Sequence, residues 1–443
     1  MNKDLTVGDP AKVLWKFCLP LFGSIIFQQL YNIADSFVAG KFIGENALAA
    51  VGNSYEITLI FIAFAFGCNI GCSVIVSQLF GAKKLGEMKT AVYTTFIASA
   101  VLCALLMLAG TLGCNGMLRL INTPENVFAD SKLYLDIYIM GLPFVFFYNV
   151  ATGIFSALGD SKTPFIFLAA SSTSNIFMDI LFVTAFKMGV AGVAIPTVLS
   201  RVVAAAVILA LLCGKRHEIH LQRGMSWRPD WGMVRNIMSV GVPNGVENSL
   251  FQLGKIVMLS LISTCGTASI AANAIGNNVA QYQILGGMSV GIAMVTVVSQ
   301  CVGAGDYEKV RAYTRKLVKL SYLFILLMVG LTLALLPLIL HLYNVSPEAD
   351  SYAIRCILLH GFSACVFWPL AFTLPNTLRA AGDAKFTMIV SVTVMWIVRI
   401  GCGYLLGGYF GWGVFGVWTA MILDWCFRIP AFLLRYRGHK WEH

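Results

Sequence analysis

Four polar residues that stand inside long apolar stretches of the sequence could together bind a cation. Asp35 lies in the first stretch, Asn175 and Asp179 are four residues apart in the fifth, and Thr197 lies in the sixth. Carboxylate, amide and hydroxyl oxygens are ligands for a hard cation such as Na⁺, and two neighbouring carboxylates can hold a shared proton. We therefore predict a cation site, either a metal site for Na⁺ or a proton site. A polar packing cluster is the alternative, although packing alone would not require two acids.

Membrane helices must position these residues, because the composition of the chain fits lipid better than water. Of the 443 residues, 58% are hydrophobic and 12% are charged, with a mean hydropathy of +0.78, whereas soluble domains carry about a quarter charged residues. An apolar stretch of about 20 residues spans a bilayer as a helix, which predicts an all-α membrane protein with twelve transmembrane helices. The predicted spans are residues 13–39, 51–79, 91–120, 132–158, 164–186, 190–213, 233–264, 268–302, 315–343, 350–380, 386–406 and 412–434.

The basic residues indicate how these helices cross the membrane. Cytoplasmic loops of membrane proteins are enriched in Lys and Arg. With the N-terminus inside, 23 of the 31 basic residues fall in inside segments and five fall outside, while Arg201, Lys255 and Arg399 lie within helices. We therefore predict that both termini are cytoplasmic and that the net charge of +10 needs no nucleic-acid partner. Counted from the outer helix ends, the four candidate cation ligands all fall in the outer half of the bilayer.

Four short motifs recur in the same order in the second half of the chain. The paired segments are residues 50–53 and 274–277, 77–82 and 299–304, 159–162 and 382–385, and 189–193 and 413–417, at offsets of 222 to 224. A repeat of six helices keeps its orientation, so we predict two parallel six-helix lobes related by a pseudo-two-fold axis along the membrane normal. The predicted lobes are residues 1–213 and 232–443, joined by a basic cytoplasmic loop over residues 214–231.

The two predicted lobes differ in their chemistry. An offset of 223 or 224 carries Asp179 to Cys402 or Gly403, and the counterpart of Asp35 is apolar as well. Because the second half lacks both acids, we assign the cation site to the N-terminal lobe.

The repeated motifs resemble those of the multidrug and toxic compound extrusion (MATE) family. The segments that carry the resemblance are residues 35–40 (Asp-Ser-Phe-Val-Ala-Gly), 47–52 (Ala-Leu-Ala-Ala-Val-Gly), 159–164 (Gly-Asp-Ser-Lys-Thr-Pro), 189–194 (Gly-Val-Ala-Gly-Val-Ala) and 303–306 (Gly-Ala-Gly-Asp). The likeness covers nearly the whole chain and is closer to the DinF-like and MepA-like bacterial branch than to the NorM branch. In that branch the cation-coupling positions match Asp35, Asn175, Asp179 and Thr197.

The resemblance implies a transporter rather than an enzyme. It implies a central cavity between the lobes and export of small, mostly cationic aromatic compounds by alternating access, coupled to H⁺ or Na⁺. It also implies a monomeric protein of the bacterial inner membrane, with no cofactor beyond the coupling ion.

Polar residues on three helices are predicted to line the substrate cavity, among the apolar walls typical of a ligand pocket. These residues are Gln28, Tyr31, Tyr148, Asn149, Glu247 and Gln252. Pro20, inside the first helix, removes one backbone hydrogen bond and favours a kink. We predict that cation occupancy at Asp35 biases this bend and so reshapes the cavity.

Two other functions deserve comparison with export. A flippase for lipid-linked saccharides should line its cavity with basic residues that bind pyrophosphate, and three cations do lie within the predicted helices. An intramembrane enzyme or an ATP-driven pump is disfavoured, because the sequence has neither an HExxH motif nor a Walker-type phosphate loop.

Overall fold

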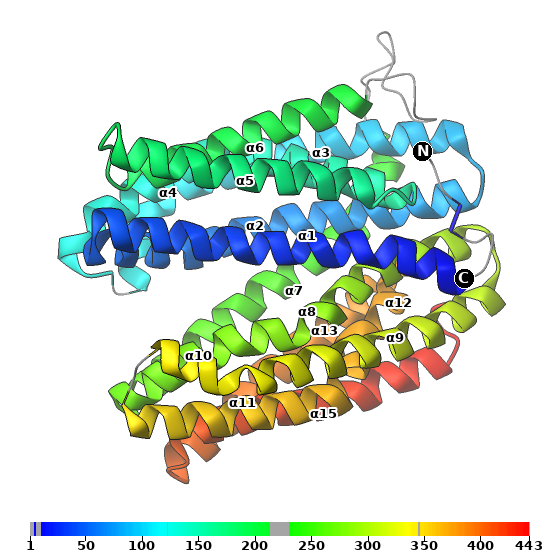
Figure 1. Cartoon of the computed structure of the whole chain (residues 1–443). Coiled ribbons are helices and arrows are strands. Elements are labelled where there is room, and N and C mark those ends of the chain that lie inside the picture. The colour runs from blue at the N-terminus through cyan, green and yellow to red at the C-terminus, as the bar shows by residue number, and fades with distance from the viewer. Residues whose placement is uncertain (1–3, 6–9, 122, 213–229, 344–345, 443) are drawn as a thin grey trace. The chain divides into compact units, whose positions relative to one another are not determined.

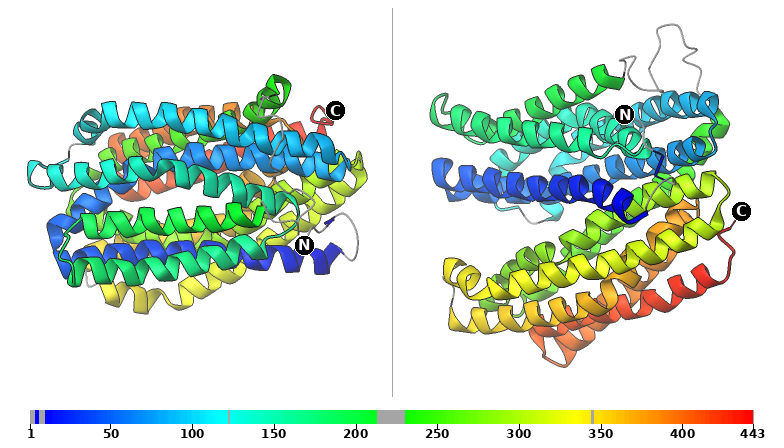
Figure 2. Two further views of the ribbon diagram at one scale, coloured as in Figure 1. Left: turned by 90° about the horizontal axis from the view of Figure 1, so that it is seen from above. Right: turned by 45° about the vertical axis from the view of Figure 1, so that its right-hand side comes forward.

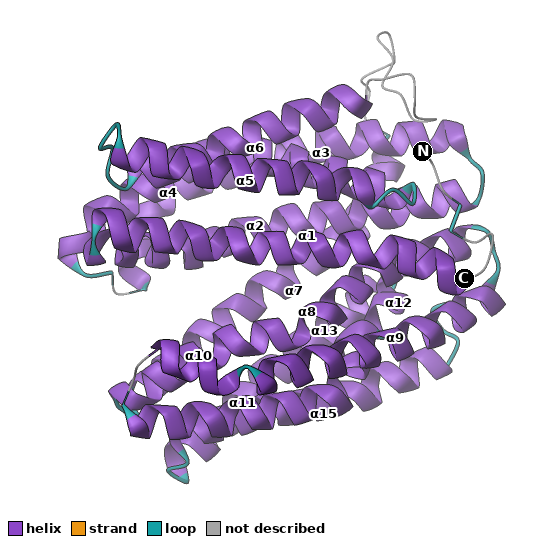
Figure 3. Cartoon of the chain, viewed as in Figure 1, coloured by secondary structure: helices purple, strands orange, loops and turns teal. Residues whose placement is uncertain are grey.

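The structure is a computed structural model that describes residues 4–5, 10–121, 123–212, 230–343 and 346–442. All its regular elements are helices, with no strand among the described residues (Figure 3). The chain divides into two compact units, Met1–Ser249 and Leu250–His443. The boundary falls inside one long helix, α7, whereas most of the predicted linker, residues 214–231, lies outside the described residues.

The N-terminal unit contains six complete long helices and the first part of α7 (Figure 1). The helices are α1 (Pro10–Val38), α2 (Glu45–Gly81), α3 (Leu85–Leu120), α4 (Glu125–Ala157), α5 (Lys162–Thr184), α6 (Ala191–Leu212) and α7 (Trp231–Ser263). A short π-helical segment, Ala39–Ile43, extends α1. The main core forms around α4, whose buried Phe146 and Phe155 pack with apolar side chains of its neighbours.

The C-terminal unit contains the remaining helices, several of which are continuous through π-helical turns. They are α8 (Thr267–Gly303), α9 (Tyr307–Ala334), α10 (Leu336–Tyr343), α11 (Pro347–Trp368), α12 (Pro375–Ala380), α13 (Ala384–Val394), α14 (Ile400–Gly403) and α15 (Gly413–Arg437). The π-helical turns are Pro369–Thr373, Met395–Arg399 and Tyr404–Tyr409. The central helix is α8, which is buried along most of its length and contacts α9, α11 and α12.

The predicted set of membrane spans agrees with these helices. Within the described residues, eleven helical segments are long and apolar enough to cross a membrane. Residues 347–380 and 384–409 each form one such span, although π-helical turns interrupt them. The twelfth predicted helix is α7, which is 33 residues long but more polar, because it carries Arg235, Glu247 and Lys255.

The repeated Gly-Asp motif has a structural reason in both units. Gly159 and Gly382 end the preceding helix with φ of 75° and 93°, a left-handed conformation that glycine adopts without strain. Asp160 then accepts hydrogen bonds from the backbone N–H groups of Lys162 and Thr163, both at 3.1 Å. The backbone turns into α5 and α13 are equivalent, because Asp160 N donates to the Phe155 carbonyl and Asp383 N to the Leu378 carbonyl. In the part of the chain that the structure describes, the second aspartate makes no such cap and pairs with Arg435 instead.

Small residues allow α2 and α7 to approach closely within the N-terminal unit. A Cβ atom on Gly67 would lie 2.6 Å from the carbonyl oxygen of Gly241, and one on Gly71 would lie 2.7 Å from that of Ile237. Backbone contact through small residues is a common way for membrane helices to associate. These glycines fix the first part of α7 against α2.

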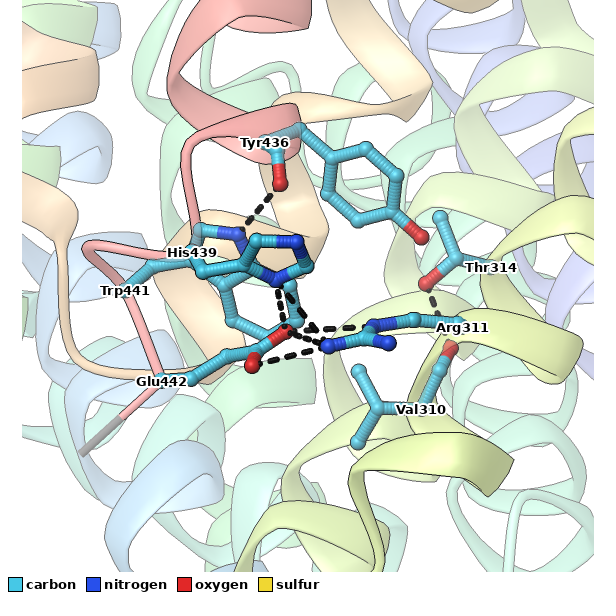
Figure 4. Close-up of polar contacts among 7 residues, drawn as sticks. All are labelled: Val310, Arg311, Thr314, Tyr436, His439, Trp441 and Glu442. Carbon is cyan, nitrogen blue, oxygen red and sulfur yellow. Dashed lines mark hydrogen bonds and ion pairs between the residues drawn. The ribbon is translucent and has the colours of Figure 1, made fainter.

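The last residues of the C-terminal unit fold back onto the start of α9 (Figure 4). Trp441 is 1% exposed, stacks on Tyr436 and donates from Nε1 to the Tyr436 carbonyl at 2.8 Å. Arg311 on α9 donates from Nη2 to both carboxylate oxygens of Glu442, at 2.7 and 2.9 Å, and His439 Nδ1 lies 3.0 Å from Oε1. We call residues 438–442 the C-terminal strap, because they tie the end of α15 to α9.

Candidate cation site and its surroundings

Asn175 and Asp179 form a buried polar pair in the middle of α5. Both side chains are fully buried, and Asn175 Nδ2 donates a long hydrogen bond of 3.5 Å to Asp179 Oδ1. They belong to a stripe of buried positions spaced by three or four residues, as expected for the inner face of a helix. The stripe comprises Pro164, Leu168, Ser172, Asn175, Asp179 and Val183. The predicted proximity of these two ligands is therefore present in the structure.

The amide oxygen of Asn175 is available to a ligand. It is buried and has no hydrogen-bond partner within the part of the chain that the structure describes. Buried polar atoms are normally hydrogen-bonded, so an unsatisfied carbonyl oxygen calls for an explanation such as an ion or a proton donor. Its position beside a carboxylate fits cation binding.

Thr197 lies on the neighbouring helix α6, where it is 5% exposed. Its hydroxyl donates to the Val193 carbonyl at 2.9 Å, one turn earlier. Val193 packs with Val183 of α5 and Val38 of α1 in one apolar cluster. The three helices that carry the predicted cation ligands therefore meet at this cluster.

The side chains of Asp35 and Tyr31 lie outside the described residues, although their backbone is part of α1. Asp35 precedes Val38 by three residues, so the helix places it one turn from the cluster that joins α1, α5 and α6. Its participation in the cation site stays a prediction.

Arg201 of α6 connects two of the predicted cavity residues. Its Nη2 atom donates to Gln28 Oε1 at 3.4 Å, and its guanidinium carbon lies 5.4 Å from the ring centroid of Tyr148. Tyr148 itself is buried. The sequence marked Arg201 as an intramembrane cation and suggested Asp179 as its partner, and the structure places it against Gln28 of α1 and Tyr148 of α4.

Asn149 is a weaker candidate for substrate contact than the sequence predicted. Its side-chain amide donates to the Val145 carbonyl at 2.8 Å on its own helix. Its backbone carbonyl accepts from Asn69 Nδ2 at 2.6 Å, and the same amide nitrogen donates to Thr152 Oγ1 at 3.0 Å. Sequence analysis missed Asn69, although an amide in the middle of the apolar part of α2 was a signal for such a contact.

The last two predicted cavity residues lie in different units. Glu247 is 9% exposed and belongs to the N-terminal unit, whereas Gln252 is half-buried and belongs to the C-terminal unit. A joint role of the two stays a prediction.

Pro20 lies inside α1, which continues from Pro10 to Val38. Two side-chain hydrogen bonds lie close to this proline. Ser161, at the start of α5, donates to the Phe17 carbonyl at 2.9 Å. Ser24 donates to the Pro20 carbonyl at 3.0 Å. One turn further on, the rings of Phe27 and Phe165 meet edge to face. Figures 1 and 2 show α1 running beside α5. α1 is thus held to α5 on both sides of Pro20, and a bend at this proline would change the direction of the part of α1 that leads to Asp35.

The duplicated long apolar helices define a polytopic α-helical membrane protein. The MatE family model matches residues 20–181 and again residues 243–405. The chain therefore belongs to the MATE family, as its motifs predicted, and is a transporter rather than an enzyme. The two matches start 223 residues apart and end 224 apart, which confirms the internal repeat found in the sequence.

Relatives and solved structures agree with this assignment. The chain is 28% identical over 409 residues to the "Probable multidrug resistance protein YoeA" of Bacillus subtilis, covering 91% of this chain and 88% of that protein. It is 26% identical over 445 residues to the "Probable multidrug resistance protein NorM" of Thermotoga maritima, covering 98% and 94%. A MOP superfamily transporter from Pyrococcus furiosus matches with a TM-score of 0.91 at 22% identity, over 98% of this chain and 97% of that chain. An outward-facing MATE family transporter matches with a TM-score of 0.90, also at 22% identity, over the same shares. These similarities confirm the predicted two-lobe fold of twelve helices.

Proposed function

We propose that this protein is an antiporter that exports small organic compounds, mostly cationic and aromatic, in exchange for H⁺ or Na⁺. The names of its relatives support drug export. The observation that carries the coupling is the buried Asn175–Asp179 pair with its unsatisfied amide oxygen. The excess of basic residues in alternate loops supports a multi-pass protein of the bacterial inner membrane with both termini in the cytoplasm. The protein acts as a monomer in this proposal.

The proposed coupling follows from the cost of a buried carboxylate. An ionised Asp179 away from water is unfavourable unless a cation or a proton neutralises it. Asp179, Asn175 and Thr197 supply oxygen atoms for that cation, and Asp35 of α1 completes the set. Because α1 is anchored before Pro20, binding of the cation to Asp35 favours one orientation of its second part. Export then requires only that the substrate and the cation favour different orientations of the second part of α1.

A flippase for lipid-linked saccharides is the second candidate. The observation that favours it is a group of cationic side chains inside the C-terminal unit, where Arg399 and Arg428 both face Phe251. Such a group could bind a pyrophosphate. Drug export remains the first proposal, because the named relatives support it.

Ethidium transport in proteoliposomes tests the antiporter. We expect ethidium movement under an imposed proton or sodium gradient, and loss of at least 90% of it, about tenfold, in Asp179→Asn. Asp136→Asn is the matched control, since this carboxylate pairs with Lys132 at a half-exposed position. Equal transport by wild type and Asp179→Asn would exclude the proposed coupling. Absence of ethidium transport by folded wild type, together with translocation of a lipid-linked saccharide, would favour the flippase.

A further inference from the structure

Three cationic side chains surround one aromatic ring in the C-terminal unit. The ring centroid of Phe251 lies 5.6 Å from Lys255 Nζ, 5.4 Å from Arg399 Cζ and 5.9 Å from Arg428 Cζ. The residues come from α7, α15 and the π-helical turn Met395–Arg399. Such turns inside helices occur often at functional sites. We call this group the cation cluster.

Arg428 is already neutralised within the protein. Its Nε donates to Asp424 Oδ1 at 2.9 Å, one turn earlier on α15, and its Nη2 donates to the Ser391 carbonyl at 3.2 Å. Arg428 is 2% exposed and Asp424 is fully buried. The guanidinium also lies 5.2 Å from the ring of Phe372. Arg428 therefore uses one oxygen of the Asp424 carboxylate, while Oδ2 is buried without a hydrogen-bond partner among the described residues.

Arg399 is left with a donor that no protein group satisfies. Its Nε is buried and has no hydrogen-bond partner among the residues that the structure describes. The negative charge of Asp424 attracts the Arg399 guanidinium. The positive charge of Arg428, which is hydrogen-bonded to Asp424, repels the Arg399 guanidinium. A buried guanidinium with an unused N–H and positive neighbours is costly. An anionic group placed beside Arg399 would remove this cost.

The chemistry of the cluster defines the ligand. A guanidinium presents its N–H donors in a planar fork that matches carboxylate or phosphate oxygens. Phe251 offers an aromatic face next to the Arg399 guanidinium, and Phe372 lies next to the neighbouring Arg428 guanidinium. We propose that the cation cluster is a binding site for the carboxylate or phosphate group of an amphiphilic aromatic or lipid-like ligand. The role of this site rests on the proposed export function. It deepens that function, because it adds compounds with an anionic group to the substrates that the protein exports.

Equilibrium binding to the purified protein in detergent tests the site without any ion gradient. The first pair of probes is 2-naphthoate and 2-naphthamide, which have the same shape but differ in charge. We expect wild type to bind naphthoate about tenfold or more tightly than naphthamide, since a hydrogen bond to a charged group contributes at least that factor. Decyl phosphate serves as the lipid-like probe. Stronger binding of naphthoate indicates a free organic anion, and stronger binding of decyl phosphate indicates a lipid headgroup.

Substitutions of Arg399 decide whether the cation cluster is responsible for the preference for the anion. Arg399→Gln should remove the preference for the anion, whereas Arg399→Lys should retain part of it because the charge remains. Arg435→Gln is the matched control: it removes a guanidinium that lies 4.8 Å from the ring centroid of Phe386 in the same unit but is paired with Asp383, and it should leave anion affinity unchanged. Size-exclusion chromatography verifies the fold of each variant. If Arg399→Gln does not fold, the anion preference of Arg399→Lys still tests the site, because this variant keeps the charge but loses the planar fork of donors.

The outcomes separate this inference from the proposed antiport. The anion site would be overturned if wild type bound naphthoate and naphthamide equally and did not bind decyl phosphate. It would also be overturned if the preference for the anion survived in Arg399→Gln. Ethidium antiport that persists in that case leaves the export function intact. Anion binding that depends on Arg399 in a protein without ethidium antiport would support the site and contradict the antiport proposal.

Discussion

At the scale of single residues, buried charges carry the chemistry of this protein. The N-terminal unit buries a carboxylate beside an amide on α5, and the C-terminal unit buries a carboxylate beside a guanidinium on α15. Each pair holds a buried oxygen without a hydrogen-bond partner among the described residues, Asn175 Oδ1 in the first and Asp424 Oδ2 in the second. In the second pair, however, Arg428 supplies the counter-charge of the carboxylate and also donates to the Ser391 carbonyl. The first pair therefore suits reversible cation binding, and the second suits a structural role.

The Asp424–Arg428 pair allows a prediction about stability. Asp424→Asn leaves Arg428 buried without its counter-charge, and removal of one partner of a buried ion pair costs about 3–5 kcal/mol. We expect a clear fall in the thermal midpoint of the purified protein. The double variant Asp424→Leu with Arg428→Met should recover much of it, because no lone charge remains. A single variant as stable as wild type would show that the ion pair does not support the fold.

At the scale of helices, α1 is held to α5 on both sides of Pro20 and is weakened at the proline itself. The proline lacks the N–H that would close one backbone hydrogen bond, while Ser161 and the Phe27–Phe165 contact hold the helix to α5 on either side. Loss of a single backbone hydrogen bond makes a bend inexpensive at this position of α1.

Pro20→Ala tests whether that bend takes part in transport. Alanine restores the missing backbone hydrogen bond and favours a straight helix, so we expect at least a fivefold lower rate of ethidium transport with an unchanged thermal midpoint. Proteoliposome transport and thermal unfolding of the same preparations provide the measurements. Pro143→Ala on α4 is the control proline. An unaltered transport rate in Pro20→Ala would argue against a role for the bend.

At the scale of the whole molecule, each unit has its own hydrophobic core. In the C-terminal unit, the C-terminal strap also ties α15 to α9. Burial alone would raise the pKa of the Glu442 carboxyl, but hydrogen bonds and charges from His439 and Arg311 outweigh it and hold the pKa below the usual 4.5. The strap therefore depends on an ionised carboxylate.

The strap should loosen in acid. Because the folded-state pKa of Glu442 is depressed, its contribution to stability is fully present above about pH 4.5 and is lost as the pH falls through the lower folded value. Limited proteolysis of the C-terminus should accelerate in that window. Glu442→Gln should show rapid proteolysis at neutral pH already, while Glu125→Gln, at an exposed helix start, should behave as wild type. A pH-independent rate in wild type would contradict the role of the carboxylate.

The sequence by itself determined the helices, their number and their duplication. Long apolar stretches allow only helices in lipid, and the repeat survives as short motifs such as the Gly-Asp turns at Gly159 and Gly382, where a left-handed backbone requires glycine. The spacing of Asn175 and Asp179 also sufficed to place both on one face, because helical periodicity is a local property.

Only the tertiary structure decided which distant side chains meet. Arg201 lies between Gln28 and Tyr148, Asn69 bonds to α4, and Arg399 shares the Phe251 ring with Arg428. These contacts join residues separated by tens to more than a hundred positions, and no periodicity encodes them. They depend on how close-packed helices are rotated against one another, which is fixed by the shapes of many side chains at once.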